Sequence, residues 1–276
     1  MSLGEAAVEA VTFDYWNTLC CEPPGGYLRS RRLEAMSQVL VDAGVGSAGV
    51  VLPFLSAAYD AAWHRWNDAW RANRQFSGLD AAHSIADAVE RHFADVPGVA
   101  GVRPDLLAAF AGQGERAELA LLDGVGETLA VLFERGVRLG IVCDVGFTPS
   151  PALLRHLERH GVLGYFHHWS FSDEVGVYKP DRRIFEHALA GLGGPDPGRC
   201  VHVGDRRRTD VAGAQAAGMR SVRITAVFED EPDQGPPGDA VIASYKELLP
   251  ILGLCRPAGM GRASPVLTCS AQPVAG

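Results

Sequence analysis

The sequence has no apolar run of the length that a membrane-spanning helix needs. Such a helix takes about 18 or more consecutive apolar residues with few or no charges, and the apolar stretches of this 276-residue chain are shorter or are interrupted by charged residues. The N-terminus also lacks a basic region followed by an apolar core, which is the pattern of a secretory signal. Both absences predict a cytoplasmic protein without a membrane partner.

Basic residues are in the minority. The 25 Lys and Arg residues face 33 Asp and Glu residues, and the formal net charge is −8. Binding to a nucleic-acid backbone depends on a basic surface that neutralises its phosphates, so this charge balance argues against a nucleic-acid partner. An acidic protein can still bind a single phosphate group locally.

The cysteines show no paired spacing of the kind that binds metal ions. Cys20 and Cys21 are adjacent and do not form a CxxC pattern, which argues against a redox pair. Because several of the cysteines lie in or beside apolar strand-like runs, we expect reduced thiols. The six cysteines are Cys20, Cys21, Cys143, Cys200, Cys255 and Cys269.

Length and composition are those of an ordinary globular protein. Hydrophobic residues make up 47% of the chain and charged residues 21%, values that indicate neither disorder nor a membrane protein. A chain of this length can bury one full core and a smaller second unit. One domain with an insertion is the economical interpretation.

The spacing of apolar residues changes along the chain. Between residues 26 and 121 it is helical, which predicts a bundle of helices. From residue 122 onward helices alternate with short apolar strands, which implies parallel pairing with right-handed crossovers. The predicted helices of the bundle are Tyr27–Ala43, Phe54–Ala72, Ala81–Phe93 and a fourth from Pro104 towards Leu121; the later strands are Val137–Cys143, Trp169–Phe171, Cys200–Gly204, Arg220–Ala226 and Ala240–Ile242.

Two groups of side chains stand out in the predicted bundle. Three tryptophans at positions i, i+3 and i+7 share one helical face, which favours a buried core position and leaves open a position facing a cleft. Three arginines in the first helix predict a solvated face. The tryptophans are Trp63, Trp66 and Trp70, and the arginines are Arg29, Arg31 and Arg32.

Single carboxylates follow two of the predicted strands. Asp14 comes directly after Ala10–Phe13, and Asp205 comes directly after Cys200–Gly204, with Asp210 shortly beyond it. One such aspartate is typical of a turn or a helix cap. Ligands of parallel sheets bind beyond the carboxyl ends of the strands, and carboxylate oxygens are the ligands that Mg²⁺ prefers. The joint order of these acids therefore favours a functional site.

Four stretches in this order resemble the four motifs of the haloacid dehalogenase superfamily of hydrolases. Each follows an apolar run, and together they span most of the chain. The resemblance implies an α/β fold with a doubly wound parallel sheet, a Rossmann-like core, and an inserted α-helical cap domain that closes over the active site. The stretches are Phe13–Leu19, Val137–Asp144, Ser172–Asp181, and Val201–Asp205 followed by Asp210.

The implied organisation sets domain boundaries. The core domain takes residues 1–22 and 122–254, and the helical cap domain takes residues 23–121. Residues 255–276 are rich in Gly, Pro, Ala and Ser and have no period, which predicts a disordered tail. The oligomeric state stays open between a monomer and a homodimer.

The resemblance also implies roles for individual residues. Asp14 is the expected nucleophile, and Lys179 is the expected cation that offsets its charge and holds a phosphate oxygen. Cys143, the third expected catalytic residue, stands where the family has a Ser or Thr hydroxyl. The expected Mg²⁺ ligands are Asp14, the backbone carbonyl of Trp16, Asp205, and Asp210 directly or through water; the expected substrate-binding residues are Trp16, Asn17, Cys143, Asp144 and Lys179.

Two positions depart from the pattern of the phosphatases in that superfamily. Trp16 stands two residues after Asp14, where those enzymes carry an aspartate as general acid and base, and Cys143 replaces the hydroxyl. Without the acid, a proton must come from the substrate, from water or from a cap residue. Because a scaffold does not carry a reaction without the residues that perform it, these departures bear on the chemistry.

The sequence therefore predicts a Mg²⁺-dependent phosphatase that acts on a small phosphorylated metabolite, a phosphomonoester, through an aspartyl-phosphate intermediate. The first alternative is a 2-haloacid dehalogenase-like hydrolase, which the aromatic Trp16 favours and the metal carboxylates Asp205 and Asp210 disfavour. The second alternative is a catalytically impaired phosphate-binding protein. Retention of Asp14 and Lys179 argues against that alternative.

Overall fold

The computed structural model describes residues 7–254 and 268–269 and divides them into two compact units. The described residues within 1–21, 119–144 and 156–276 form one unit, which we call the sheet unit. Residues 22–118 and 145–155 form the other, which we call the helical unit. The predicted core range 122–254 contains the segment 145–155, and in this division that segment belongs with the helices.

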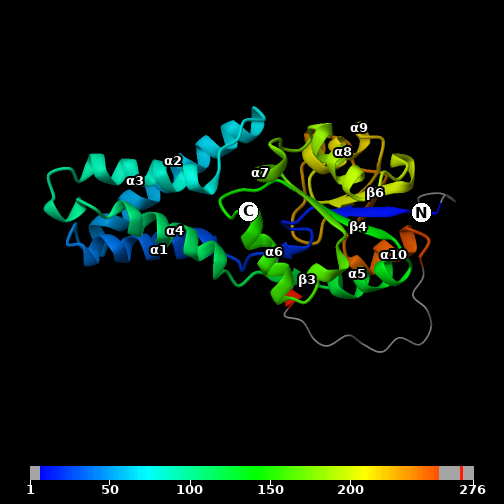
Figure 1. The fold of residues 1–276 in the computed structure, drawn as a ribbon, viewed down its shortest axis with the longest axis horizontal. Coiled ribbons are helices and arrows are strands. Elements are labelled where there is room, and N and C mark those ends of the chain that lie inside the picture. The colour runs from blue at the N-terminus through cyan, green and yellow to red at the C-terminus, as the bar shows by residue number, and fades with distance from the viewer. Residues whose placement is uncertain (1–6, 255–267, 270–276) are drawn as a thin grey trace. The chain divides into compact units, whose positions relative to one another are not determined.

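The sheet unit is built on six parallel strands (Figure 1). Their order in space is β5-β4-β1-β6-β7-β8, so the chain extends the sheet in both directions from β1. The predicted α/β class with a doubly wound parallel sheet is confirmed. The strands are β1 (Ala10–Phe13), β4 (Arg138–Cys143), β5 (His168–Phe171), β6 (Cys200–Gly204), β7 (Arg220–Ile224) and β8 (Ala240–Ile242).

The central strands are short apolar runs that are buried on both faces, as parallel strands between helices are. Every residue of β1 is fully buried. Helices α8 and α9 cover one face, and α5 and α10 cover the other (Figure 1). The helices that follow the strands are α5 (Val125–Glu134), α6 (Ser150–Arg159), α7 (Ser172–Val175), α8 (Arg182–Gly191), α9 (Ala212–Ala216) and α10 (Leu248–Ile251).

Strand order determines which loops share one edge of the sheet. Strand β1 pairs in parallel with β4 on one side and with β6 on the other. Asp14, Asp144 and Asp205 each come directly after one of these three strands. The carboxyl ends of adjacent parallel strands lie at one edge, and the point where the strand order reverses is where such sheets bind ligands.

A second, small sheet differs from the prediction. It pairs β2 (Cys20–Cys21) antiparallel with β3 (Ala120–Leu122), and β3 pairs in parallel with β9 (Thr268–Cys269). The predicted fourth helix towards Leu121 was wrong at its end, because the helix stops at Glu115 and the chain then joins this sheet. The predicted disordered tail includes residues 268 and 269, which form β9, and its other residues lie outside the described part of the chain.

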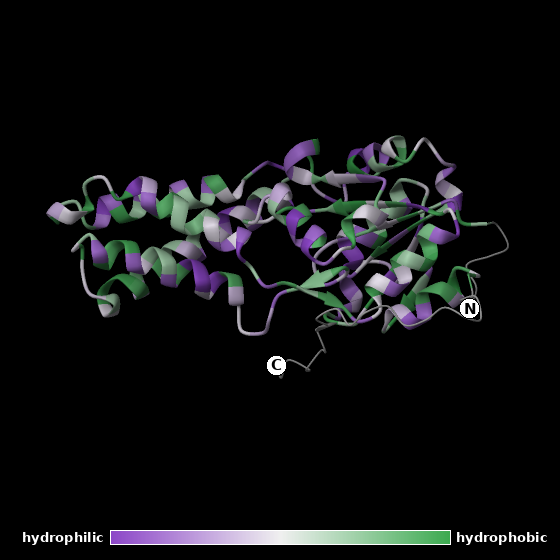
Figure 2. Cartoon of the chain, turned by 60° about the horizontal axis from the view of Figure 1, so that its bottom comes forward, coloured by the Kyte–Doolittle hydropathy of each residue, from purple (hydrophilic) through white to green (hydrophobic). Residues whose placement is uncertain are grey.

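The helical unit contains four main helices. They are α1 (Tyr27–Asp42), α2 (Ala48–Arg71), α3 (Gly78–His92) and α4 (Arg103–Glu115). Hydrophobic and hydrophilic residues intermix along each helix (Figure 2), as in amphipathic helices that bury one face. Ser77 begins α3 with a capping box, in which its hydroxyl accepts from the N–H of Asp80 and the Asp80 carboxylate accepts from Ser77 N–H.

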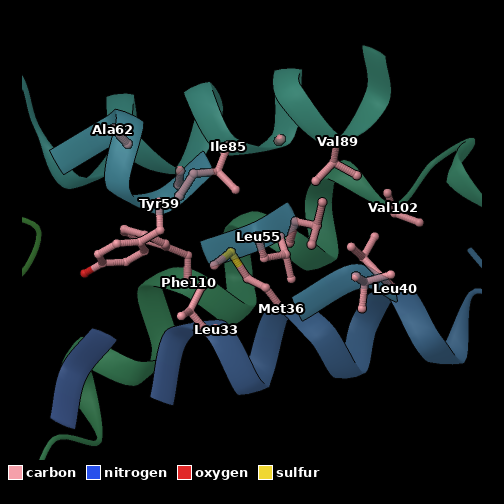
Figure 3. Packing of buried hydrophobic residues seen from close by; sticks show 14 of the residues in the cluster. Leu33, Met36, Leu40, Leu55, Tyr59, Ala62, Ile85, Val89, Val102 and Phe110 are labelled. Atoms are coloured by element: carbon pink, nitrogen blue, oxygen red, sulfur yellow. The ribbon is translucent and has the colours of Figure 1, made fainter. Parts of the chain in front are cut away.

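The buried faces of these helices meet in one apolar core (Figure 3). Leu33 and Met36 from α1 pack with Leu55 from α2, Ile85 from α3 and Phe110 from α4. Each of these five side chains is almost fully removed from water. Burial of apolar area on this scale is the main stabilising term of such a bundle.

One arginine contradicts the prediction of a solvated face. Arg32 is only 2% exposed, and its guanidinium donates to the Thr148 hydroxyl at 3.0 Å and to the Phe147 carbonyl at 3.2 Å. It also lies 4.7 Å over the Phe110 ring. The spacing of charges along α1 does not reveal this role, because the acceptors lie far away in the sequence.

The three tryptophans form a stacked row on α2. Trp63 and Trp66 have ring centroids 4.9 Å apart, and Trp66 and Trp70 have ring centroids 5.6 Å apart. Trp66 is buried and donates from its indole nitrogen to the Val145 carbonyl at 3.3 Å, whereas Trp63 is 43% exposed. The favoured core position therefore holds for Trp66 but not for Trp63.

Among the described residues, no helix has both the length and the apolar character that crossing a lipid bilayer takes.

Candidate active site

Asp14 stands where β1 turns into the first loop. Its backbone N–H donates to the Val203 carbonyl at 2.8 Å, which continues the pairing of β1 with β6 by one residue. The following turn closes when the N–H groups of Leu19 and Cys20 donate to the Tyr15 carbonyl. The sheet and this turn together fix the position of a carboxylate that is only 5% exposed.

Lys179 connects two carboxylates at this edge. Its Nζ lies 2.6 Å from Oδ1 of Asp14 and 2.6 Å from Oδ1 of Asp210, and it also donates to the Val142 carbonyl at 3.1 Å. Burial alone would lower the pKa of Lys179, but the two carboxylates raise it well above its usual value. Lys179 is therefore a buried, charged ammonium.

Asp14, Asp205 and Asp210 form a buried cluster of carboxylates. One oxygen from each lies within 4.8 Å of the others. Burial, with a smaller contribution from Asp210, raises the pKa of Asp14 to about 7, even though Lys179 lowers it. Burial and the two neighbouring acids raise the pKa of Asp205 well above its usual value. The single ammonium of Lys179 therefore does not balance the three carboxylates of this cluster.

A divalent cation fits this cluster by its donor chemistry. Mg²⁺ binds oxygen ligands, and one or two carboxylates plus water and phosphate oxygens are its usual set in proteins. Asp14, which follows β1, and Asp205 and Asp210, which follow β6, supply carboxylate oxygens that lie within 4.8 Å of one another. A bound cation would also relieve the repulsion that adds to the effect of burial in raising the pKa values of Asp14 and Asp205.

Asp210 is held by several donors at once. Its Oδ2 accepts from the Arg206 backbone N–H at 3.0 Å, and its Oδ1 lies 3.1 Å from Nε2 of His202. Burial would raise the pKa of Asp210, but Lys179 and His202 lower it well below its usual value. Gly204 makes room for the carboxyl group, because a Cβ at that position would lie 2.3 Å from Asp210 Cγ.

His202 was not singled out in the sequence. It is paired directly with Thr12 across β1 and β6, and its Nδ1 lies 2.9 Å from the Thr12 hydroxyl oxygen. A neutral ring with its proton on Nε2 donates to Asp210 and accepts from Thr12. A histidine in an apolar strand, two residues before a glycine–aspartate turn, was the available signal.

Cys143 and Asp144 lie at the end of β4. The Cys143 thiol is fully buried and donates to the Asp144 backbone carbonyl at 3.4 Å. Burial, reinforced by the negative charge of Asp14, raises the pKa of that thiol well above its usual value. Asp144 accepts the backbone N–H of Lys179 at 2.8 Å through Oδ1. Cys143 is thus a neutral thiol near pH 7. One carboxylate oxygen of Asp144 holds the backbone N–H of Lys179 in place.

Trp16 and Asn17 occupy the turn after Asp14. Asn17 adopts a left-handed backbone conformation with φ of 57°, which asparagine tolerates better than most residues. Its side-chain amide donates to Asp205 Oδ2 at 3.3 Å. Trp16 is half-buried and packs its ring against Tyr15 at a centroid distance of 5.2 Å. An indole offers no proton of useful acidity at this position.

The structure brings together the acids and the lysine that the sequence singled out. Asp14 and Asp210 contact Lys179 directly, Asp205 joins them in the carboxylate cluster, and Asn17 contacts Asp205. The catalytic, substrate-binding and metal-binding roles assigned to these residues stay predictions.

The family to which this chain belongs follows from a match to a protein-family model. The family model of haloacid dehalogenase-like hydrolases matches residues 8–218, a span that includes Asp14 and Asp210. The chain belongs to this hydrolase family. The match covers most of the chain and confirms the resemblance that the four motifs indicate.

Curated relatives of this haloacid dehalogenase-like hydrolase include phosphatases. The pyrimidine 5'-nucleotidase YjjG of Escherichia coli is 35% identical over 96 residues, which cover 35% of this chain and 41% of the relative. The phosphoserine phosphatase of Thermus thermophilus is 30% identical over 198 residues, which cover 70% of this chain and 73% of the relative. The first of these matches thus spans about two fifths of the relative's length.

Solved structures share the fold. A 2-haloacid dehalogenase from Pseudomonas syringae has a TM-score of 0.65 at 22% identity, and the match covers 89% of this hydrolase and 98% of that chain. At this identity the likeness establishes the fold alone. It leaves the choice between phosphate and halide chemistry to the residues of the site.

Proposed function

We propose that this hydrolase is a Mg²⁺-dependent phosphatase that acts on a small phosphorylated metabolite through an aspartyl-phosphate intermediate. The observation that carries the proposal is the buried cluster of Asp14, Asp205 and Asp210 with Lys179 inside it. Three carboxylates at one sheet edge suit a divalent cation that binds a phosphate group, whereas release of halide from carbon needs no metal carboxylates. Phosphatase relatives support the same choice.

In this mechanism Asp14 attacks the phosphorus atom and the bond to the leaving oxygen breaks. Lys179 holds Asp14 at 2.6 Å and offsets charge on the phosphoryl oxygens. Bound Mg²⁺, held by Asp14, the Trp16 carbonyl, Asp205 and Asp210, would supply further positive charge for those oxygens. Water then hydrolyses the aspartyl-phosphate and releases phosphate, which restores Asp14.

Substrate contacts come from the same loops. Cys143 is proposed to face the phosphoryl group as a weak donor, and Trp16, Asn17 and Asp144 are proposed to line the site. Trp16 cannot protonate the leaving oxygen, so substrates with good leaving groups should react best. General acid catalysis is typically worth about 10²–10⁴-fold, so its absence slows the reaction without abolishing it.

Two other functions compete with this one. A 2-haloacid dehalogenase would use Asp14 to attack carbon and release halide, a reaction that needs no proton on the leaving group and no metal carboxylates. An impaired phosphate-binding protein would keep the cluster without turnover. The retained Asp205 and Asp210 beside Lys179 favour the phosphatase.

Turnover of p-nitrophenyl phosphate with Mg²⁺ and with EDTA tests the proposal. We expect hydrolysis with Mg²⁺ and little with EDTA, and equal rates would remove the metal mechanism. Halide release from small 2-haloacids tests the dehalogenase. A folded protein that turns over neither substrate class would favour the phosphate-binding alternative.

We propose a cytoplasmic enzyme whose partner is its small-molecule substrate, with a cap domain at residues 23–121 inserted in the core domain. A screen of metabolite phosphates would identify the substrate, and sedimentation would decide between monomer and homodimer.

A further inference from the structure

Arg206 directly follows the proposed metal ligand Asp205. Its contacts differ from those of the next residue, Arg207. The backbone N–H of Arg206 donates to Asp210 Oδ2 at 3.0 Å, so its Cα is fixed beside two of the three carboxylates. Its guanidinium lies 4.5 Å over the ring of Phe228. Within residues 7–254 this guanidinium takes part in no hydrogen bond or ion pair.

Phe228 belongs to a segment that is itself firmly attached to the sheet unit. The next two residues anchor it, because Glu229 forms an ion pair with Arg223 at 2.9 Å and Asp230 accepts the Arg207 backbone N–H at 2.8 Å. Arg207 and Arg223 are both almost fully buried. The Phe228 ring is therefore a fixed platform under the Arg206 guanidinium.

We propose that Arg206 is a substrate-binding residue that donates to an oxyanion group of the substrate. This inference rests on the proposed phosphatase function and extends it. A guanidinium is a planar fork of five donors that suits phosphate and carboxylate oxygens, and stacking on an aromatic ring leaves its edge donors free. Arg206 is half-buried, so a ligand can reach it from solvent.

Charge at the site supports the same role. The Arg206 guanidinium lowers the pKa of Asp205 against the larger effect of burial, and by more than Lys179 does. Its positive charge therefore acts on Asp205, one of the carboxylates that are proposed to hold Mg²⁺. With a weak thiol donor at Cys143, Arg206 adds a strong donor for an anionic ligand.

Arg206→Gln separates substrate binding from support of the metal ligands. The backbone N–H that Asp210 accepts remains in this variant, and only the charged fork is lost. We expect calorimetry with inorganic phosphate and Mg²⁺ to show about tenfold or greater loss of phosphate affinity, the size of a charged hydrogen bond. Mg²⁺ affinity without phosphate should stay equal or rise, because a positive charge beside the cluster is removed.

Three variants control this measurement. Arg199→Gln removes the same charge at the amino end of β6, away from Asp205, and should leave both affinities unchanged. Arg206→Lys should keep part of the phosphate affinity. Phe228→Leu removes the platform and should weaken phosphate binding by about threefold, within the range of an exposed cation–π contact.

A matched pair of ligands identifies which oxyanion Arg206 binds. O-phosphoserine and phosphoethanolamine differ by one carboxylate, and both can be tested as competitive inhibitors of p-nitrophenyl phosphate hydrolysis. Equal weakening of both ligands and of phosphate in Arg206→Gln assigns Arg206 to the phosphoryl group. Selective weakening of O-phosphoserine, with phosphate binding unchanged, assigns it to a second anionic group.

Two results would overturn the inference. In the first, Arg206→Gln binds phosphate and both inhibitors as the wild type does, and the proposed phosphatase function still stands. In the second, Mg²⁺ affinity falls together with phosphate affinity, which would make Arg206 a support for the metal ligands. A wild-type protein that binds no phosphate in the presence of Mg²⁺ would instead reject the phosphatase function and this inference with it.

Discussion

Nε2 of His202 lies 3.1 Å from Oδ1 of Asp210, and both groups are buried. This contact joins the middle of β6 to a proposed metal ligand that follows the same strand. Burial lowers the pKa of His202 from its usual value, although Asp210 acts in the opposite direction. The folded protein therefore holds this imidazole neutral.

The first prediction concerns the stability that His202 contributes at different pH. The unfolded chain takes up a proton on this histidine as the pH falls through about 6.5, whereas the folded protein does so only at lower pH. Stability from His202 is thus present above about pH 6.5 and is lost below it, by at most about 1.4 kcal/mol per pH unit. Urea unfolding with EDTA should show the advantage of the wild type over His202→Gln shrinking from pH 8 towards pH 5. A difference that stays constant over this range would contradict the prediction.

The six-stranded sheet and the acids at its edge could be predicted from the sequence because their signals are local. Each strand is a short apolar run, and Asp14 and Asp205 directly follow such runs. Parallel pairing with helical crossovers then places the ends of these strands at one edge. No contact between distant residues had to be known to reach this part of the site.

The rest depended on contacts between residues far apart in the sequence. Pairing of β2 with β3 joins residues 20–21 to residues 120–121, and neither strand is long enough to show a period of two. Arg32 has the charge of a surface residue, and only its distant acceptors explain its burial. His202 reads as a strand residue until the structure shows Thr12 on one side and Asp210 on the other.

The second prediction concerns the missing general acid. Trp16→Asp places a carboxyl group two residues after Asp14, within a turn that the sheet already fixes. Turnover of alkyl phosphates should increase more than turnover of aryl phosphates, because only the poorer leaving group needs the proton. Steady-state kinetics on an alkyl and aryl pair measures this, and uniform loss on both substrates would count against it.

If Trp16 instead shapes the binding site, the same variant will change KM across substrates and leave the ratio of kcat values for the alkyl and aryl pair unchanged. The two outcomes therefore separate proton delivery from pocket shape.

The third prediction concerns Cys143. Its buried thiol is neutral and is a weaker donor than a hydroxyl. Cys143→Ser should strengthen the contact to the phosphoryl group in the transition state by about 1 kcal/mol, which is somewhat under tenfold in rate. The comparison is Asp14→Asn, which should lose turnover because it removes the nucleophile. A dead serine variant together with a fully active asparagine variant would reject Asp14 as the nucleophile.

The last prediction concerns Lys179, whose ammonium lies between Asp14 and Asp210. Lys179→Met leaves those buried carboxylates without their cation, and breaking a buried ion pair from one side typically costs about 3–5 kcal/mol. We expect the variant to unfold at lower urea concentration with EDTA and to lose turnover with Mg²⁺. Excess Mg²⁺ should stabilise the variant more than the wild type, because the cluster then lacks its buried ammonium and ligand binding to the folded state adds to stability. Lys246→Met is the matched control. The Lys246 side chain is 81% exposed, and its ion pair with Asp123 is long, at 3.8 Å. This control variant should change neither stability nor turnover appreciably. If Mg²⁺ stabilises Lys179→Met no more than the wild type, the cation does not bind beside Asp14 and Asp210, and the metal site has been placed wrongly.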